Sequence, residues 1–339
     1  MANLLDLPNE IISKILSIVA STCPKFWLRS ILISSRRLSL ILRPLIIKRV
    51  RFCLDSNRHL AKCALFMRTL DENPELRGMV HSLALFWKYE NHEDEDVREK
   101  AKLILESLPG LKSLSIRAGT DDYSNRHRYS FSPQFLEVNP MPDLREIEIS
   151  SSRLTIENMQ KYMVLSHAEH ITIRSELTGS PSELEAITKR TSPVLILALD
   201  LWNHIRPQDL RDVLKRCPRI ETLRCALPRF SVTNSCRSRR IVTPLRPVEL
   251  SKALASARDS LREFEFQVCA CGRLDQVDSR MDLSMMRVLK SISCPAECFF
   301  SPSPVYFTRT GLYELLPASL EELTVSNELI QRHVNPLNF

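Results

Sequence analysis

Four cysteines in the C-terminal third of the chain have the residue type that a zinc site requires. They form two close pairs, Cys269 with Cys271 and Cys294 with Cys298. Four thiolates are a complete ligand set for structural zinc, but such ligands are usually spaced as CxxC, whereas these pairs are spaced as CxC and CxxxC. Cys294 also occupies an apolar position of a repeated strand pattern. The sequence therefore favours thiols packed in a core, and we expect no bound metal.

Other motifs that carry chemistry are missing from the sequence. The chain has six glycines, and no two are close enough to form a GxGxxG motif, a P-loop or a GxSxG turn. The HAEH segment at 167–170 lacks the HExxH spacing that places two histidines on one helix face, and it runs directly into a predicted strand. No nucleophile, base and orienting group can be assembled. We expect a protein that is not an enzyme and uses no cofactor.

Length and composition predict a folded protein inside the cell. The chain has 339 residues, of which 44% are hydrophobic, and this is ample for a core. Arg43 and Lys48 interrupt the strongest apolar run, so no membrane span is expected. Because no basic segment precedes the first apolar stretch, a secretory signal is not expected either. We expect a location in the cytoplasm, the nucleus or both, with reduced thiols.

The net charge of +7 raises the question of nucleic-acid binding. Basic residues are, however, spread along the whole chain and are matched locally by acidic residues in most segments. Aromatic residues make up only 6% of the sequence, and none alternate with basic residues in the way that base stacking requires. We expect no nucleic-acid partner.

The stretch from Leu4 to Phe52 predicts three short helices. Between Leu7 and Val19, apolar residues recur every three or four positions, which places them on one side of a helix. Pro8 suits the first turn of that helix, where its missing N–H is no loss. Further apolar runs cover 27–33 and 38–47, with a polar step between them. A unit of roughly 50 residues cannot bury so many apolar side chains by itself, so the surplus must contact another surface.

The segments LPNEIISKIL and ISSRRL within this stretch resemble an F-box, the module through which substrate receptors of Skp1–cullin ubiquitin ligases bind Skp1. One departure is Leu38, where family members usually have an aromatic residue. The resemblance implies that Skp1, and through it a cullin, is a partner. It assigns Skp1 binding to Leu5, Leu7, Pro8, Ile11, Ile12, Ile15, Leu16, Leu28, Ile31 and Leu32. The alternative is a helical cap whose apolar face packs inside a repeat protein.

A second pattern, LxxLxL, occurs nine times from Val80 to Val325. Its copies are 24 to 41 residues apart, and helical periodicity fills the intervals at 96–108, 155–165, 182–189, 207–217 and 247–257. Strand and helix alternating at such a period predict parallel strands with right-handed crossovers. The sequence therefore predicts an α/β fold for the body of the chain.

This body resembles the leucine-rich-repeat region that often follows an F-box. The resemblance implies an F-box of three helices at 1–52, a linker helix at 53–76 and, at 77–339, a right-handed α/β leucine-rich-repeat solenoid of about nine degenerate repeats. The asparagine or cysteine that normally follows each strand is absent. Those positions hold Gly119, Ser152, Glu176, Trp202 and Pro228.

The resemblance as a whole implies the substrate-recognition subunit of a Skp1–cullin–F-box ubiquitin ligase, which holds a protein target and catalyses nothing itself. The alternative is a leucine-rich-repeat scaffold without a role in ubiquitin transfer. Because strand side chains alternate, polar residues next to the apolar pairs must face away from the core. These candidate target-binding residues are Ser115, Arg117, Glu148, Arg174, Asp200, Arg224 and Glu265. Two polar insertions, at 118–138 and 229–245, are the alternative place for target recognition.

Overall fold

The structure is a computed structural model. It describes residues 6–22, 25–54, 57–87, 95–118, 133, 136, 141–179, 191–201, 205–226, 246–267, 280–300 and 311–326. The chain divides into two compact units. Unit 1 comprises residues 1–117 with 141–144, and unit 2 comprises 118–140 with 145–339. The domain boundaries expected at 52 and 76 stay predictions.

Unit 1 begins with three helices, as the apolar runs predict. They are α1 (Asn9–Thr22), α2 (Lys25–Ser34) and α3 (Arg36–Ile47). Ser35 caps α3 because its hydroxyl accepts a hydrogen bond from the backbone N–H of Leu38 at 3.5 Å. The side chains of Ile12, Leu16, Leu38 and Leu42 form a buried core between α1 and α3. Leucine at position 38 therefore fills the interior.

The rest of unit 1 combines a small sheet with further helices. The elements are β1 (Arg49–Cys53), α4 (Asn57–Glu72), the 3₁₀ helix η2 (Pro74–Met79), β2 (Ser82–Trp87), α5 (Glu95–Glu106) and β3 (Ser113–Ala118). β1 pairs in parallel with β2, and β3 lies on the other side of β2. No copy of the LxxLxL pattern covers β1, so this strand was not predicted from the sequence. Its RVRFC sequence alternates charged and apolar side chains, and Phe52 is buried beside Leu85.

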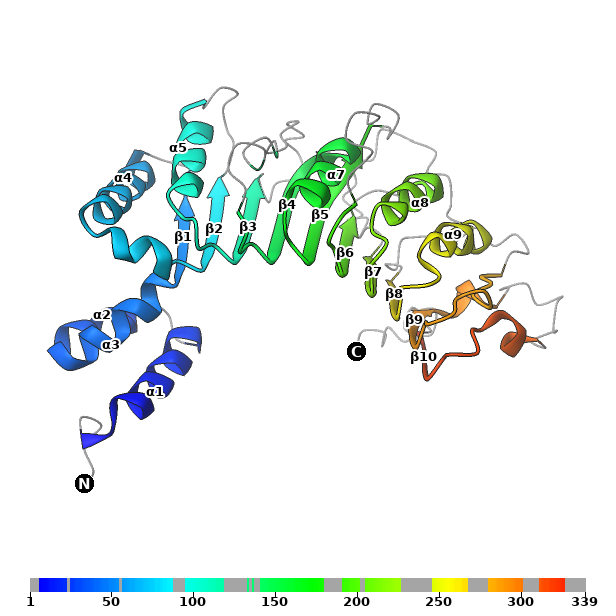
Figure 1. Cartoon of the computed structure of the whole chain (residues 1–339), viewed down its shortest axis with the longest axis horizontal. Helices are drawn as coiled ribbons and strands as arrows, with labels where there is room; N and C mark the ends of the chain where they lie inside the picture. The colour runs from blue at the N-terminus through cyan, green and yellow to red at the C-terminus, as the bar shows by residue number, and fades with distance from the viewer. Residues whose placement is uncertain are drawn as a thin grey trace, which may run out of the picture. The chain divides into compact units, whose positions relative to one another are not determined.

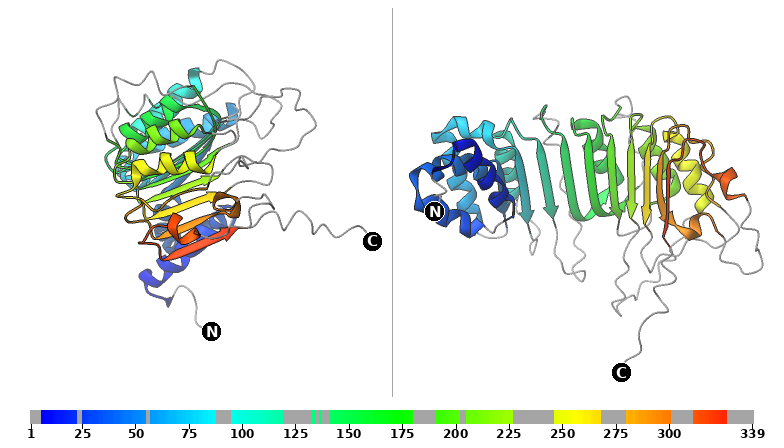
Figure 2. Two further views of the ribbon diagram at one scale, coloured as in Figure 1. Left: turned by 90° about the vertical axis from the view of Figure 1, so that its right-hand side faces the viewer. Right: turned by 90° about the horizontal axis from the view of Figure 1, so that it is seen from below.

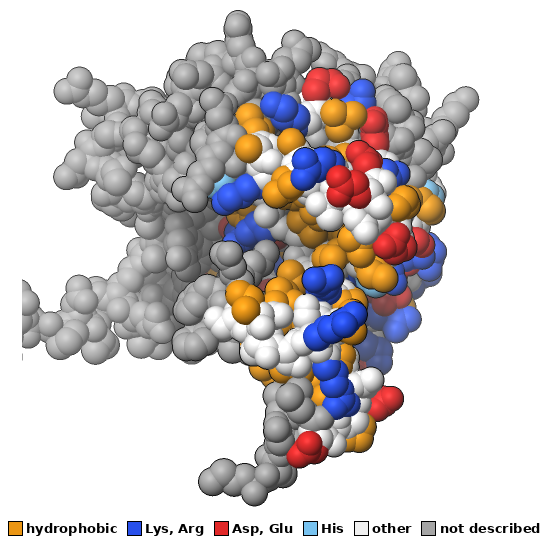
Figure 3. Space-filling model, turned by 90° about the vertical axis from the view of Figure 1, so that its left-hand side faces the viewer, with side chains coloured by type: hydrophobic (Ala, Val, Ile, Leu, Met, Phe, Trp, Pro, Cys, Tyr) orange, Lys and Arg blue, Asp and Glu red, His pale blue; other side chains and the backbone are white. Residues whose placement is uncertain are grey.

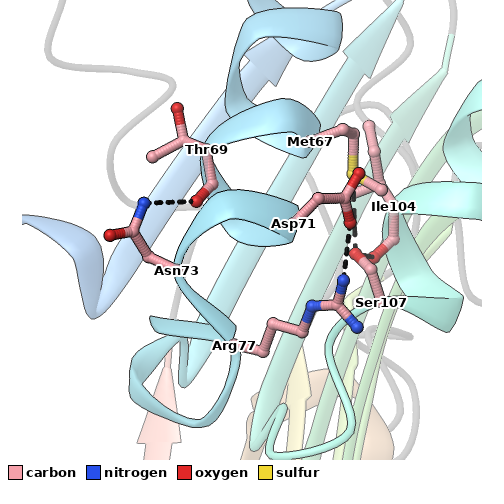
Figure 4. Close-up of polar contacts among 7 residues, drawn as sticks. All are labelled: Met67, Thr69, Asp71, Asn73, Arg77, Ile104 and Ser107. Atoms are coloured by element: carbon pink, nitrogen blue, oxygen red, sulfur yellow. Dashed lines mark hydrogen bonds and ion pairs between the residues drawn. The ribbon is translucent and has the colours of Figure 1, made fainter. Parts of the chain in front are cut away.

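Polar contacts hold α4, η2 and the end of α5 together (Figure 4). The side-chain amide of Asn73 donates to a carbonyl in the last turn of α4 at 3.0 Å, which ends that helix. The guanidinium of Arg77 in η2 pairs with the carboxylate of Asp71. The hydroxyl of Ser107, just after α5, contacts the sulfur of Met67 in α4 at 3.5 Å. Both helices are thus fixed within unit 1.

Unit 2 is a parallel sheet covered by helices. Its elements are β4 (Glu146–Thr155), α7 (Ile156–Leu165), β5 (His170–Thr178), β6 (Ile196–Leu201), α8 (Pro207–Lys215), β7 (Thr222–Ala226), α9 (Pro247–Leu254), η4 (Ala255–Ala257), β8 (Glu263–Gln267), β9 (Ser291–Pro295), η5 (Ala296–Cys298), η6 (Leu312–Leu315) and β10 (Glu322–Ser326). Each strand from β4 to β10 pairs in parallel with the next one along the chain. Helices α7, α8 and α9 lie on the same face of this sheet (Figures 1 and 2).

The register of unit 2 places the apolar positions of LxxLxL side by side. Ile147, Ile171, Leu197, Leu223 and Phe264 are successive partners across five strands and are buried on the helix-covered face. The expected α/β class with parallel strands is therefore confirmed. The last copy is an exception to the burial, because Leu323 is only half-buried and Val325 is 37% exposed. β10 is the last strand in the sheet order.

Local sequence signals set the helix ends. α8 and α9 each begin with proline, at Pro207 and Pro247, where the helix needs no N–H. α7 begins after Thr155, whose hydroxyl accepts from the N–H of Asn158 at 3.1 Å. The helix expected at 182–189 lies outside the described residues. Among the helices that the structure describes, none has the length and the apolar content to cross a membrane.

Candidate functional site

The candidate Skp1-binding residues lie at three depths in the helices of unit 1. Ile12 and Leu16 are buried in the core and hold α1 against α3. Pro8 and Ile11 are exposed at the start of α1. Four more are half-buried, namely Leu7, Ile15, Ile31 and Leu32. Of these, Leu7, Ile31 and Leu32 pack against the core from its edge. Leu5 and the side chain of Leu28 lie outside the described part of the chain. The structure thus separates residues that support the surface from residues that form it.

The start of α1 is fixed by main-chain and side-chain hydrogen bonds. The carbonyl of Pro8 accepts from the N–H groups of Ile11 and Ile12, both at 3.1 Å, and this closes the first turn. Arg37, in the first turn of α3, donates from Nη2 to the carbonyl of Leu7 at 2.8 Å. It also donates from Nε to Oδ1 of Asn9 at 2.9 Å. The LP segment and the SSRR segment, far apart in the sequence, are therefore joined through one guanidinium.

Large apolar side chains are exposed on the same helices. The exposed fractions are 43% for Ile11, 64% for Ile18, 78% for Ile33 and 64% for Leu40. Of these, only Ile11 was among the candidate residues. The exposure of Leu40 could have been predicted from the sequence. It is two positions from both Leu38 and Leu42 on the helix and so cannot share their buried face. Figure 3 views unit 1 from its left-hand side in Figure 1 and shows hydrophobic side chains at the surface among Lys and Arg.

The candidate target-binding residues lie on the sheet face opposite the helices, as strand alternation predicts. Arg174, Asp200 and Arg224 are exposed. The remaining candidates, Ser115, Arg117, Glu148 and Glu265, are half-buried. Their neighbours in the LxxLxL pattern are buried on the other face. In unit 2, strand pairing places Arg174 beside Asp200, and Arg224 beside Glu265.

The charged candidates of unit 2 pair with one another. Nη1 of Arg174 is 3.0 Å from a carboxylate oxygen of Glu148, and its Nε is 3.7 Å from Oδ2 of Asp200. Nε of Arg224 is 3.3 Å from Oε2 of Glu265. Sequence reasoning placed these arginines on the face but did not give their partners. A carboxylate from another protein would have to compete with those of the chain itself.

We expect substitution of these arginines to have little effect on stability. Arg174→Ala and Arg224→Ala should each lower the free energy of unfolding by about 1 kcal/mol or less, because exposed ion pairs contribute only ~0–1 kcal/mol. Chemical denaturation of the purified variants measures the difference. A loss well above that value in either variant would contradict the exposed positions of these pairs.

Most of the cysteines that the structure describes are buried in the cores of the two units. Burial raises the pKa of Cys63 to about 11, and the pKa values of Cys217 and Cys225 to about 12. The pKa of Cys298 is also raised, first by its hydrogen bond with Cys294 and then by burial. Thiols in such surroundings remain protonated at neutral pH.

Of the four cysteines considered as zinc ligands, the structure describes two. Cys294 and Cys298 are both buried near the end of unit 2. Cys269 and Cys271 lie outside the described ranges. Within the described ranges, no group of three or more His, Cys, Asp or Glu side chains could hold a metal ion.

No protein-family model matches the sequence, and no curated protein matches it significantly. The residues of the chain itself therefore carry the functional inference.

Proposed function

We propose that this protein is the substrate-recognition subunit of a Skp1–cullin–F-box ubiquitin ligase. In this proposal α1, α2 and α3 form the F-box and bind Skp1. The α/β region forms degenerate leucine-rich repeats and binds a protein target inside the cell. The protein makes and breaks no bonds, because holding target lysines near the ubiquitin-carrying enzyme raises their effective concentration.

The observation that carries the proposal is the excess of apolar surface on the three helices. Among the side chains that the structure describes, four are buried in their core. Ile11, Ile18, Ile33 and Leu40 remain exposed around it. Exposed apolar side chains of this size, gathered on a short helical segment, are typical of a surface that binds another protein. The LPNEIISKIL segment, whose resemblance to an F-box names the partner, comprises Leu7, Pro8 and the first eight residues of α1.

The contact residues in this proposal differ from the supporting ones. Pro8, Ile11 and Ile33 present exposed side chains that Skp1 can cover. Ile12 and Leu16 keep the helices in place beneath them and need not contact the partner. Covering one leucine or isoleucine contributes roughly 1.5–3 kcal/mol, so a few such residues are enough for a tight complex.

Co-expression with Skp1 tests the proposal. We expect the full chain expressed alone to aggregate through its exposed apolar helices, and the chain co-expressed with Skp1 to elute as a soluble complex on size exclusion. Tyr313→Ser, which removes an exposed aromatic from unit 2, serves as a control and should leave the complex intact.

A different outcome would favour the scaffold alternative. A chain that stays monomeric at high concentration without Skp1, and that does not bind Skp1 when the two are mixed, needs no partner for its first three helices. Those helices would then act as the cap of a repeat protein.

A further inference from the structure

The open sheet face of unit 1 differs in charge from that of unit 2. Burial alternates along β1, β2 and β3, with Phe52, Leu83 and Leu114 on the covered side. The side chains on the open face are Arg49, Arg51, Cys53, Ser82, Ala84, Phe86, Ser113, Ser115 and Arg117. This set, which we call the arginine face, contains three arginines and no acidic residue.

Phe86 lies between two of these arginines. The guanidinium carbon of Arg51 is 4.3 Å from the centre of the Phe86 ring, and that of Arg117 is 5.2 Å from it. Because Phe86 is on β2 and the arginines are on the strands to either side, the two guanidinium groups flank the ring. A cation over an aromatic ring is attracted to it, and this fixes the direction of each guanidinium. The stacked groups still present N–H donors along their edges.

The arginines on the two sheet faces differ in whether they form ion pairs with carboxylates of the chain. On the unit 2 face, Arg174 and Arg224 each pair with a carboxylate of the chain, from Glu148, Asp200 or Glu265. On the arginine face, Arg49 and Arg51 form no ion pair with any residue that the structure describes. Positive charge held in place without a neighbouring carboxylate attracts an anionic partner.

We propose that the arginine face binds an Asp- and Glu-rich segment of a protein, with Arg49 and Arg51 as its principal anchors. Each guanidinium forms paired hydrogen bonds with one carboxylate, and the segment lies along β1. The anchors are two residues apart on β1, which places their Cα atoms roughly 7 Å apart at the usual rise per residue. That separation suits successive carboxylates better than a single phosphate group. The inference rests on the proposed function only in taking this segment to belong to the target.

Nucleic acid fits the arginine face less well than an acidic peptide does. Proteins that bind single strands stack bases on exposed aromatic rings. Phe86 is the only aromatic side chain in the arginine face, and guanidinium groups already cover it from both flanking strands. A phosphate backbone would find arginines here but no ring for its bases.

Fluorescence anisotropy tests the proposal on the full chain, either alone or in complex with Skp1. The probe is a fluorescein-labelled peptide of Asp, Glu and Gly. We expect salt-sensitive binding that Arg51→Ala weakens about tenfold or more, since a charge-assisted contact is lost. Phe86→Leu, which keeps an apolar side chain but removes the ring, should also weaken it. Arg258→Ala is the control, because that arginine is exposed in unit 2 but already paired with Asp259.

Three results would overturn the proposal. The first is equal affinity of the Arg51→Ala and Arg258→Ala variants for the peptide. The second is tighter binding of a labelled single-stranded DNA than of the peptide. The third is a large gain in affinity when the chain's own Glu90, Glu93 and Asp94 are replaced by Gln and Asn, since the face would then serve an internal segment.

Skp1 capture by the same variants separates this inference from the proposed function. Arg51→Ala is outside α1, α2 and α3 and should bind Skp1 normally. Skp1 capture without peptide binding would refute the arginine face alone. Peptide binding without Skp1 capture would refute the ligase role and leave the arginine face standing.

Discussion

Replacing both Leu7 and Pro8 by alanine should weaken Skp1 binding by about a hundredfold or more. Leu7 is half-buried against the helix core and Pro8 is exposed beside it. Losing apolar contact from two such residues costs roughly 3 kcal/mol or more, and each 1.4 kcal/mol changes the dissociation constant tenfold. Titration of immobilised Skp1 with the purified variant and with the unaltered chain measures this difference.

A second variant removes an ambiguity, because Leu7→Ala also takes apolar contact from the core. Pro8→Ala combined with Ile11→Ser changes only exposed side chains, so the melting temperature should stay nearly constant while Skp1 binding falls. If both double variants bind Skp1 at full strength, the F-box assignment is wrong.

The largest loss of stability is expected from Phe264→Ala in β8. The side chain is 1% exposed, and its ring is stacked near that of Phe266 with centroids 6.2 Å apart. Truncating a buried phenylalanine costs about 3–5 kcal/mol, through lost burial and the cavity left behind. Chemical denaturation should show a midpoint shifted to much lower denaturant.

The neighbouring residue supplies the control for this measurement. Glu265 is on the other face of β8 and pairs with Arg224, so Glu265→Ala should cost about 1 kcal/mol or less. Similar losses for the two substitutions would mean that β8 does not alternate between a covered and an open face.

The predictable part of this fold is the part that local periodicity encodes. Apolar residues two apart, such as Leu197 and Leu199, reach the same face of a strand, and the predicted strands around them are present. The helix beginning at Pro207 is equally local, because proline suits its first turn. Residue spacing alone was enough for the α/β class and for the face on which the candidate charges lie.

The remaining features depend on register between strands that are distant in sequence. β1 escaped notice because its outward side chains are arginines and its two inward ones, Val50 and Phe52, are too few to form a pattern. The contact of Arg51 with Phe86 requires a pairing across more than thirty residues, which no local signal specifies. The ion pairs of Arg174 are similar, since one partner is on β4 and the other on β6. Loop lengths set these alignments, and the loops vary widely between repeats.

The reactivity of the buried cysteines can be used to measure local opening of the structure. Only a thiolate reacts quickly with an alkylating reagent, and the thiolate fraction at neutral pH falls tenfold for each unit by which the pKa rises. Cys63 in α4, Cys217 after α8 and Cys225 in β7 therefore become reactive chiefly when the surrounding structure opens. Mass spectrometry after timed exposure to iodoacetamide would then rank the opening of unit 1 against that of two neighbouring elements of unit 2, with no label introduced by mutation.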